Sequence, residues 1–132
     1  MTRFQRLILA AVCLGAASCS SSKHIHEASN GPRWQHYQTG VASWYGSQRS
    51  RERLANGGRY CATQFAAAHR KLPFGSQVRV TNLNNGRSCV VVVNDRGPFI
   101  RGRVVDVTWI AARELGLLTA GVAKVKLELP EG

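Results

Sequence analysis

The chain has 132 residues, enough for one compact domain and too few for two. Its hydrophobic fraction of 44% and its 13 glycines exclude a disordered or fibrous protein and are typical of a turn-rich globular one. Eighteen lysines and arginines against seven acidic residues give a net charge of +11, which favours anionic partners such as nucleic acid, lipid headgroups or an acidic wall polymer.

Residues 1–18 have the pattern of a secretory signal peptide. Arg3 and Arg6 precede an apolar run that is too short to span a membrane, and small residues follow it. The tetrapeptide Ala-Ala-Ser-Cys that ends at Cys19 resembles a bacterial lipobox, although Ala16 stands where that signal prefers Leu. We predict that Cys19 is lipidated and anchors the protein in the outer membrane; the alternative is an ordinary signal peptide cleaved nearby.

Export determines how the remaining cysteines are interpreted. Cys61 and Cys89 are left as one pair in an oxidising compartment, and we predict a disulfide between them. The alternative is two buried thiols that never meet. We expect no metal site, because the chain has no Cys-x-x-Cys motif and three of its four histidines precede residue 39.

Residues 19–38 are polar, contain Gly31-Pro32 and show little periodicity, which predicts a flexible linker. The predicted domain covers residues 39–130. Alternating hydrophobic residues separated by turn residues predict five or six strands and one or two short helices, the composition of a small closed β-barrel. In chain order we expect strands at 40–46, 77–81, 88–94, 102–108 and 121–130, a charged loop at 49–58, a short apolar segment at 63–69, a hairpin turn at Asn84-Asn85-Gly86, and a short helix from Trp109 between the N-cap Thr108 and Gly116.

Several motifs resemble the rare lipoprotein A family, the septal-ring lytic transglycosylases. The motifs are "GVASWYG", "AAAHRKLPFGSQVRVTNLNNGRS", "VVVNDRGPFIRGRVVDVT" and "GVAKVKLE", and together they span residues 40–129. The resemblance implies a mainly β fold, a six-stranded double-psi β-barrel, and a periplasmic protein without a cofactor that cleaves or binds peptidoglycan glycan strands. It also suggests septal protein partners. We expect a monomer, and nucleic-acid binding is not expected of an exported chain.

The resemblance assigns catalytic residues. The acid of "NDRG" in the family is an active-site carboxylate and corresponds to Asp95, and the family histidine corresponds to His69. A third family residue, a glutamate, falls at Gly58, so it is missing here although Ala55-Asn56-Gly57 keeps the rest of its motif. A glutamate at this position would be strained if the turn needs a positive φ at Gly58. The alternatives are that Asp95 only caps its turn and that His69 is a buried structural histidine.

Other polar and aromatic residues near these motifs are candidates for substrate binding. Arg96 either contacts the glycan or a backbone carbonyl, Arg101 binds sugar or is a solvated charge, and Asp106 is expected to cap the helix. Glu52 is a weak candidate to replace the missing glutamate. The predicted substrate-binding residues are Asn94, Arg96, Trp44, Tyr45 and Arg101, with core packing as the alternative for the two aromatic residues.

The missing glutamate leaves two functional hypotheses. Glycoside hydrolases generally need two carboxyl groups. A lytic transglycosylase needs no water, because the C6 hydroxyl of N-acetylmuramic acid attacks its own C1, and one carboxyl group is then sufficient as acid and later as base. The first hypothesis is therefore an endolytic transglycosylase that forms 1,6-anhydromuramic ends in wall remodelling and septation, and the second is a peptidoglycan-binding or septal scaffold protein without turnover.

Overall fold

A computed structural model describes residues 31–132 of the chain. The predicted signal peptide, the lipidation site Cys19 and most of the predicted linker lie outside these residues. The first strand, β1 (Trp34–Trp44), begins five residues before the predicted domain boundary at 39. Its polar first half is paired with the end of β6 (Val122–Pro130), from Trp34 opposite Pro130 to Gln38 opposite Leu127. The predicted boundary was wrong because a strand exposed to water on one side carries no long hydrophobic signal.

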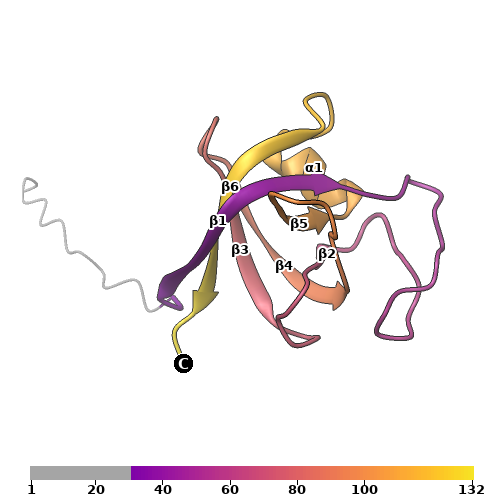
Figure 1. Ribbon diagram of the computed structural model, residues 1–132, viewed down its shortest axis with the longest axis horizontal. Helices are drawn as coiled ribbons and strands as arrows, with labels where there is room; N and C mark the ends of the chain where they lie inside the picture. The colour runs from indigo at the N-terminus through magenta and orange to yellow at the C-terminus, as the bar shows by residue number, and fades with distance from the viewer. Residues whose placement is uncertain (1–30) are drawn as a thin grey trace, which may run out of the picture. The chain divides into compact units, whose positions relative to one another are not determined.

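Six strands close into a barrel, which confirms the predicted fold class (Figure 1). Around the barrel their order is β1-β5-β2-β4-β3-β6. The pairs β1–β5 and β2–β4 are parallel, and the other four are antiparallel. The remaining elements are β2 (Ala66–Ala68), β3 (Gln77–Asn82), β4 (Ser88–Asp95), β5 (Arg103–Val107) and the helix α1 (Trp109–Leu115).

The valine-rich strands supply the core of the barrel. On β3 and β4 every second side chain points inward, and Val78, Val80, Val91 and Val93 are all at most 1% exposed. The hairpin between these strands forms at the predicted turn, where Gly86 has a φ of 77°. Helix α1 packs against the same core, whose other residues are Ala42, Ala67, Leu72, Val104, Val105, Val107, Ala111, Ala112, Leu115, Leu117, Ala123, Val125 and Leu127.

Helix α1 has the predicted ends but not the predicted cap interactions. Thr108 is its N-cap and Gly116 ends it with a φ of 75°. The Thr108 hydroxyl donates to the Gln64 carbonyl oxygen at 2.7 Å instead of capping the helix. Asp106 was expected to cap α1, and this was wrong: its carboxylate binds the Arg103 guanidinium at 2.6 Å on β5.

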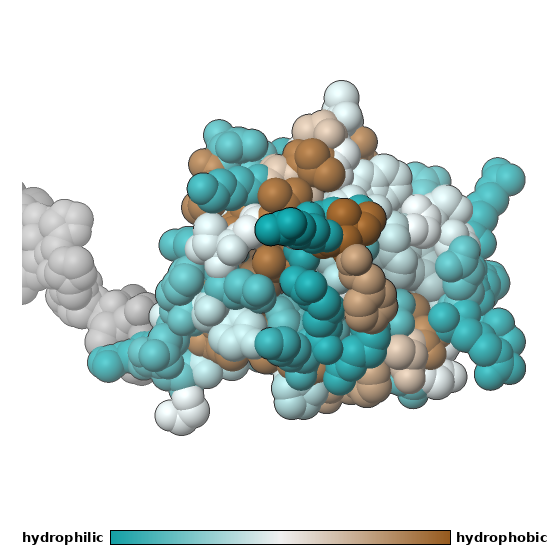
Figure 2. All heavy atoms as spheres, viewed as in Figure 1, coloured by the Kyte–Doolittle hydropathy of each residue, from teal (hydrophilic) through white to brown (hydrophobic). Residues whose placement is uncertain are grey.

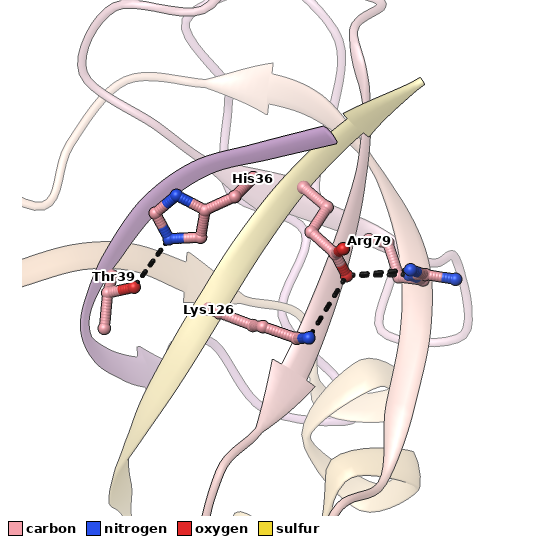
Figure 3. Close-up of polar contacts among 5 residues, drawn as sticks. His36, Thr39, Arg79 and Lys126 are labelled. Carbon is pink, nitrogen blue, oxygen red and sulfur yellow. Dashed lines mark hydrogen bonds and ion pairs between the residues drawn. The ribbon is translucent and has the colours of Figure 1, made fainter. Parts of the chain in front are cut away.

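Polar contacts on the outside of the barrel join β3 to β6, and a further one lies within β1 (Figure 3). The buried carboxylate of Glu128 on β6 binds Arg79 of β3 at 2.9 Å, and Lys126 lies 3.9 Å from the same oxygen atom. The Arg79 guanidinium also lies 5.0 Å from the ring centre of Trp34. On β1, His36 is hydrogen-bonded to Thr39 at 2.8 Å, so this histidine belongs to a strand and not to a linker.

The predicted disulfide is not formed. Cys61 and Cys89 are both free thiols. Cys89 lies on β4 and packs against the barrel core, and burial raises its pKa to about 12. Cys61 is exposed in the loop before β2, where a hydrogen bond with Thr63 lowers its pKa. The cysteine count predicted a pair, but the barrel places one thiol against the core and the other in a surface loop.

Candidate active site

Asp95 is the last residue of β4, where the valine strand leaves the barrel wall. Its Oδ1 atom accepts hydrogen bonds from the backbone N–H of Ala55 at 2.8 Å and of Arg96 at 2.9 Å. The bond from Arg96 is the turn-capping interaction that was the alternative interpretation of this residue. The bond from Ala55 spans forty residues and fastens the long segment between β1 and β2 to the carboxylate. Asp95 is therefore both a turn residue and the anchor of a surface loop.

Two buried polar atoms without a hydrogen-bond partner in residues 31–132 lie close to Asp95 in the sequence or in space. They are the hydroxyl oxygen of Tyr45 and the side-chain oxygen of Asn94. Burial, followed by the charge of Asp95, raises the pKa of Tyr45, so the hydroxyl stays protonated at neutral pH. Because a buried hydroxyl is costly without an acceptor, it is suited to donate a hydrogen bond to the neighbouring Asp95 carboxylate or to an incoming ligand.

The turn that carries position 58 is held next to Asp95 through Ala55. The Leu54 N–H donates to the Gly58 carbonyl oxygen at 2.8 Å, and the Gly58 N–H donates to the Asn56 side chain at 2.8 Å. The residue with positive φ is Gly57, at 91°, and not Gly58. The condition for strain at Gly58 is therefore not met, and a Cβ atom built there meets only the Asn56 side chain, whose oxygen lies at 3.1 Å.

His69 has both ring nitrogens engaged within the protein. Nδ1 accepts the backbone N–H groups of Lys71 and Leu72, each at 3.1 Å, so Nε2 carries the proton and donates to Gln38 Oε1 at 3.0 Å. His69 as a whole is only 3% exposed. Burial, followed by the charges of Arg70, Arg96 and Lys71, lowers its pKa.

The backbones of His69 and Asp95 meet, since the His69 N–H donates to the Asp95 carbonyl oxygen at 3.2 Å. Their side chains, however, bind different sets of residues. These contacts support the alternative of a structural histidine, and a direct catalytic role for His69 stays a prediction.

Arg96 binds the protein itself. Its Nη1 atom donates to the carbonyl oxygens of Leu72 at 2.8 Å and His69 at 3.2 Å, and its guanidinium lies 3.9 Å from the ring centre of Phe74. These contacts support the carbonyl alternative raised by the sequence, and glycan binding by Arg96 stays a prediction. Arg101 is exposed in the loop between β4 and β5.

Trp44 and Tyr45 do not line the same pocket. Trp44 lines an open pocket of about 340 Å³ with Trp109, and Tyr45 packs edge-on against Tyr60 at 5.2 Å. Sequence reasoning gave no role to Tyr60, whose hydroxyl donates to the Tyr45 carbonyl oxygen at 2.8 Å and accepts the Trp109 N–H at 3.0 Å. The signal available for Tyr60 was its position two residues after Gly58 of the glycine turn.

The sequence profile of the lytic transglycolase family matches residues 37–127, which include every residue of this site. The chain belongs to this family. It is an RlpA-type double-psi β-barrel protein. Over 90 residues it is 52% identical to the probable endolytic peptidoglycan transglycosylase RlpA of Synechocystis sp., covering 68% of this chain and 28% of that one.

Other members of the family align over the same part of the chain. The endolytic peptidoglycan transglycosylases RlpA of Neisseria meningitidis (serogroup A strain) and Pseudomonas aeruginosa (strain UCBPP-PA14) are 50% and 51% identical, over 69% and 67% of this chain and 38% and 26% of theirs. The chain thus spans between about a quarter and two fifths of the length of these relatives. Among solved structures, the Streptomyces papain inhibitor has the same fold, with a TM-score of 0.57 and 24% identity over 71% of this chain and 94% of its own.

Residues 31–132 contain no group of three or more histidine, cysteine or acidic side chains arranged to hold a metal ion. No helix within the same residues has the length and apolar character needed to cross a membrane.

Proposed function

We propose that this domain is an endolytic peptidoglycan transglycosylase in which Asp95 carries the proton transfers. The observation that supports this most is the placement of Asp95: its carboxylate lies beside the buried hydroxyl of Tyr45 and is bonded to the turn that holds position 58. The relatives' names, which specify endolytic cleavage of peptidoglycan, support the substrate class.

The reaction needs one proton to move from one sugar oxygen to another. The bond between C1 of N-acetylmuramic acid and the leaving O4 of the next sugar breaks, and C1 forms a new bond with its own O6. The leaving O4 receives a proton, and O6 loses one, so no water is consumed. Asp95 serves as the acid for O4 and then as the base for O6, a general acid–base contribution of about 10²–10⁴-fold. The Tyr45 hydroxyl orients the sugar by donating a hydrogen bond.

The second candidate function is a peptidoglycan-binding protein without turnover. Two observations favour it: Gly58 occupies the position of the family glutamate, and both ring nitrogens of His69 are already bonded within the protein. Both candidate functions involve binding to peptidoglycan, and only the first forms a product.

Digestion of purified glycan strands distinguishes these functions. We expect mass spectrometry to find 1,6-anhydromuramic ends after incubation with the purified protein. New reducing ends without the anhydro ring would indicate a hydrolase, and binding without any new ends would indicate the second function.

The cellular setting is proposed on the same basis. A protein that acts on peptidoglycan is exported, and we propose a periplasmic location with lipid attachment at Cys19 and septal partners. Replacing Cys19 with serine is expected to release the protein from the membrane fraction, and an unchanged membrane fraction would contradict lipid attachment at Cys19.

A further inference from the structure

Two neighbouring pockets border the segment Ser47–Arg51, which follows β1. The first, of about 340 Å³, is lined by Trp44, Trp109, Ser47, Gln48 and Arg49. The second, of about 390 Å³, is lined by Gln48, Arg49, Ser50, Arg51 and Tyr60–Thr63. They share Gln48 and Arg49, so a ligand of two parts can occupy both. Figure 2 shows hydrophilic side chains projecting from the right-hand edge of the molecule, where Figure 1 places the segment between β1 and β2.

The first pocket is aromatic. Trp44 comes from the end of β1 and Trp109 from the first turn of α1, and the two indoles are half-buried. The Arg113 guanidinium lies 5.8 Å from the ring centre of Trp109 and fixes that indole from the helix. Large, rigid aromatic faces with polar groups at their rim suit a sugar ring, whose C–H groups pack on the indole while its hydroxyls reach the polar side chains.

The second pocket is basic, and its arginines form no ion pair in the described residues. Among residues 31–132 every ion pair involves Glu128 or Asp106, so none reaches the arginines of the 49–59 loop. Further along the same loop, the backbones of Arg53 and Arg59 pair in an isolated bridge, and Arg59 donates to the carbonyl oxygen of the pocket residue Arg51 at 3.3 Å. Like charges placed opposite each other are destabilising unless an anion lies between them, and guanidinium groups match a carboxylate with two parallel hydrogen bonds.

We propose that these two pockets form one subsite for an acidic sugar of the glycan, with the sugar ring on the two tryptophans and its carboxylate on Arg49 and Arg51. The proposal rests on the proposed function for the choice of polymer. Muramic acid in peptidoglycan carries such a carboxylate, either on its own lactyl group or on the peptide attached to it. The arginines would bind either carboxylate in the same way, and removal of the peptides distinguishes the two sources.

The subsite is connected to the candidate active site by its loop. The same loop continues from Arg51 to Ala55, whose N–H holds the Asp95 carboxylate. Tyr60 lines the basic pocket and bonds the backbone of Tyr45, which stands next to Asp95. An acidic sugar bound here therefore contacts the same loop that holds the Asp95 carboxylate.

The test measures binding of the full chain to purified sacculi on ice, where turnover is slow. The double variant Arg49→Gln/Arg51→Gln is compared with Arg33→Gln/Lys124→Gln, which removes the same charge from two exposed residues outside the loop. We expect the loop variant to bind about tenfold more weakly, about 1.4 kcal/mol, and the control to lose less than about threefold. Equal losses in the two variants would overturn the proposal in favour of nonspecific charge attraction.

A chemical arm of the same experiment removes the ligand's charge. Sacculi whose carboxylates are converted to neutral amides are expected to bind wild type and the loop variant equally, and a persisting difference would overturn the carboxylate assignment. Glycan strands freed of peptides by an amidase retain the lactyl carboxylate. Binding that survives this treatment assigns the lactyl group, and binding that is lost assigns the peptide.

Chitohexaose, which has the sugar rings and no carboxylate, tests the aromatic pocket. We expect it to quench the tryptophan fluorescence of wild type, of Trp34→Phe and of the arginine variant. Trp44→Leu is expected to show no quenching. Trp44→Phe, which keeps an aromatic face, is expected to retain binding. Melting curves verify that each variant folds. Absence of quenching in wild type would overturn the aromatic half. Binding that behaves as expected without any anhydro product would refute the proposed catalysis and leave the subsite standing.

Discussion

At the scale of single residues, the contacts of Asp95 determine which substitution tests its proton transfer without disturbing the fold. Asparagine has the same shape, and its side-chain oxygen can still accept the N–H groups of Ala55 and Arg96. Asp95→Asn therefore removes the titrating group while keeping the loop in place. We expect formation of anhydro ends to fall at least 10²-fold, with the melting temperature and sacculus binding nearly unchanged. Chromatography of the digested glycan measures this, and full activity in a folded variant would refute the catalytic role.

Gly58 and Gly57 form a matched pair for restoring the family glutamate. Gly58→Glu is expected to fold, because only Gly57 has a positive φ and the new Cβ atom requires a small shift of the Asn56 side chain. If the new carboxyl joins Asp95 as a second acid or base, the rate rises by up to about 10²–10⁴-fold.

Gly57→Glu is the control for this prediction. A glutamate at a φ of 91° is strained, so this variant is expected to lose about 1–3 kcal/mol of folding free energy and to gain no activity. Digestion assays and melting curves of both variants are compared. Two equally stable, equally inactive variants would contradict both the backbone argument and the assignment of position 58.

The buried neutral His69 predicts a pH dependence of stability. Because its pKa is lower in the folded than in the unfolded protein, the unfolded state binds the additional proton first as the pH falls. The stability due to the neutral ring is complete above the unfolded pKa of about 6.5 and is lost as the pH falls through the lower folded pKa. Protonating Nδ1 also breaks its bonds with Lys71 and Leu72.

Thermal unfolding between pH 8 and 5 measures this effect. We expect the melting temperature of wild type to fall more steeply below pH 6.5 than that of His69→Gln, which does not titrate there. Parallel curves for the two proteins would show that His69 titrates alike in the folded and unfolded states.

At the scale of elements, the early start of β1 makes the domain boundary testable. A chain that begins at residue 33 keeps the pairing of Trp34–Gln38 with β6, and a chain that begins at residue 39 loses it. The shorter chain also loses the Gln38 side chain that accepts from buried His69, and an unpaired buried group costs about 1–3 kcal/mol by itself.

We therefore expect the chain from residue 39 to be less stable by about 2–4 kcal/mol, with lost strand hydrogen bonds of about 0.5–1.5 kcal/mol each contributing the remainder. Urea unfolding of both truncations measures the difference. Gln38→Ala in the longer chain isolates the His69 contribution. Equal stability of the truncations would mean that the first half of β1 contributes nothing to the barrel.

At the scale of the whole molecule, the excess of basic residues predicts salt-dependent attachment to the wall. The net charge is +11, and the arginines of the 49–59 loop form no ion pairs with acidic residues in the described part of the chain. Exposed charges interact through a field that salt screens over about 10 Å at 0.1 M. We expect sacculus binding to weaken steadily from about 10 mM to 500 mM salt in a sedimentation assay. Binding independent of salt would assign the affinity to aromatic stacking.

Most of the barrel was predictable because its signals are local. The alternating valines of β3, the run of four valines on β4, the Asn84-Asn85-Gly86 turn and the Thr108 and Gly116 helix ends each depend on neighbouring residues, and the structure confirms them. The first half of β1 was missed because its pairing partner, the end of β6, lies 89 to 96 residues further along the chain, from Gln38–Leu127 to Trp34–Pro130. The disulfide was predicted from a count of cysteines, which carries no information on where the thiols lie.

The sequence alone determined the family, the valine core and the carboxylate at the end of β4, because these depend on residue type and spacing. Only the tertiary structure decided what surrounds that carboxylate. Barrel closure brings the Ala55 N–H and the Tyr45 hydroxyl to Asp95, engages both nitrogens of His69, turns Arg96 to backbone carbonyls and places Trp44 beside Trp109. These contacts join residues distant in the chain, and their geometry follows from strand order and register, which no local pattern encodes.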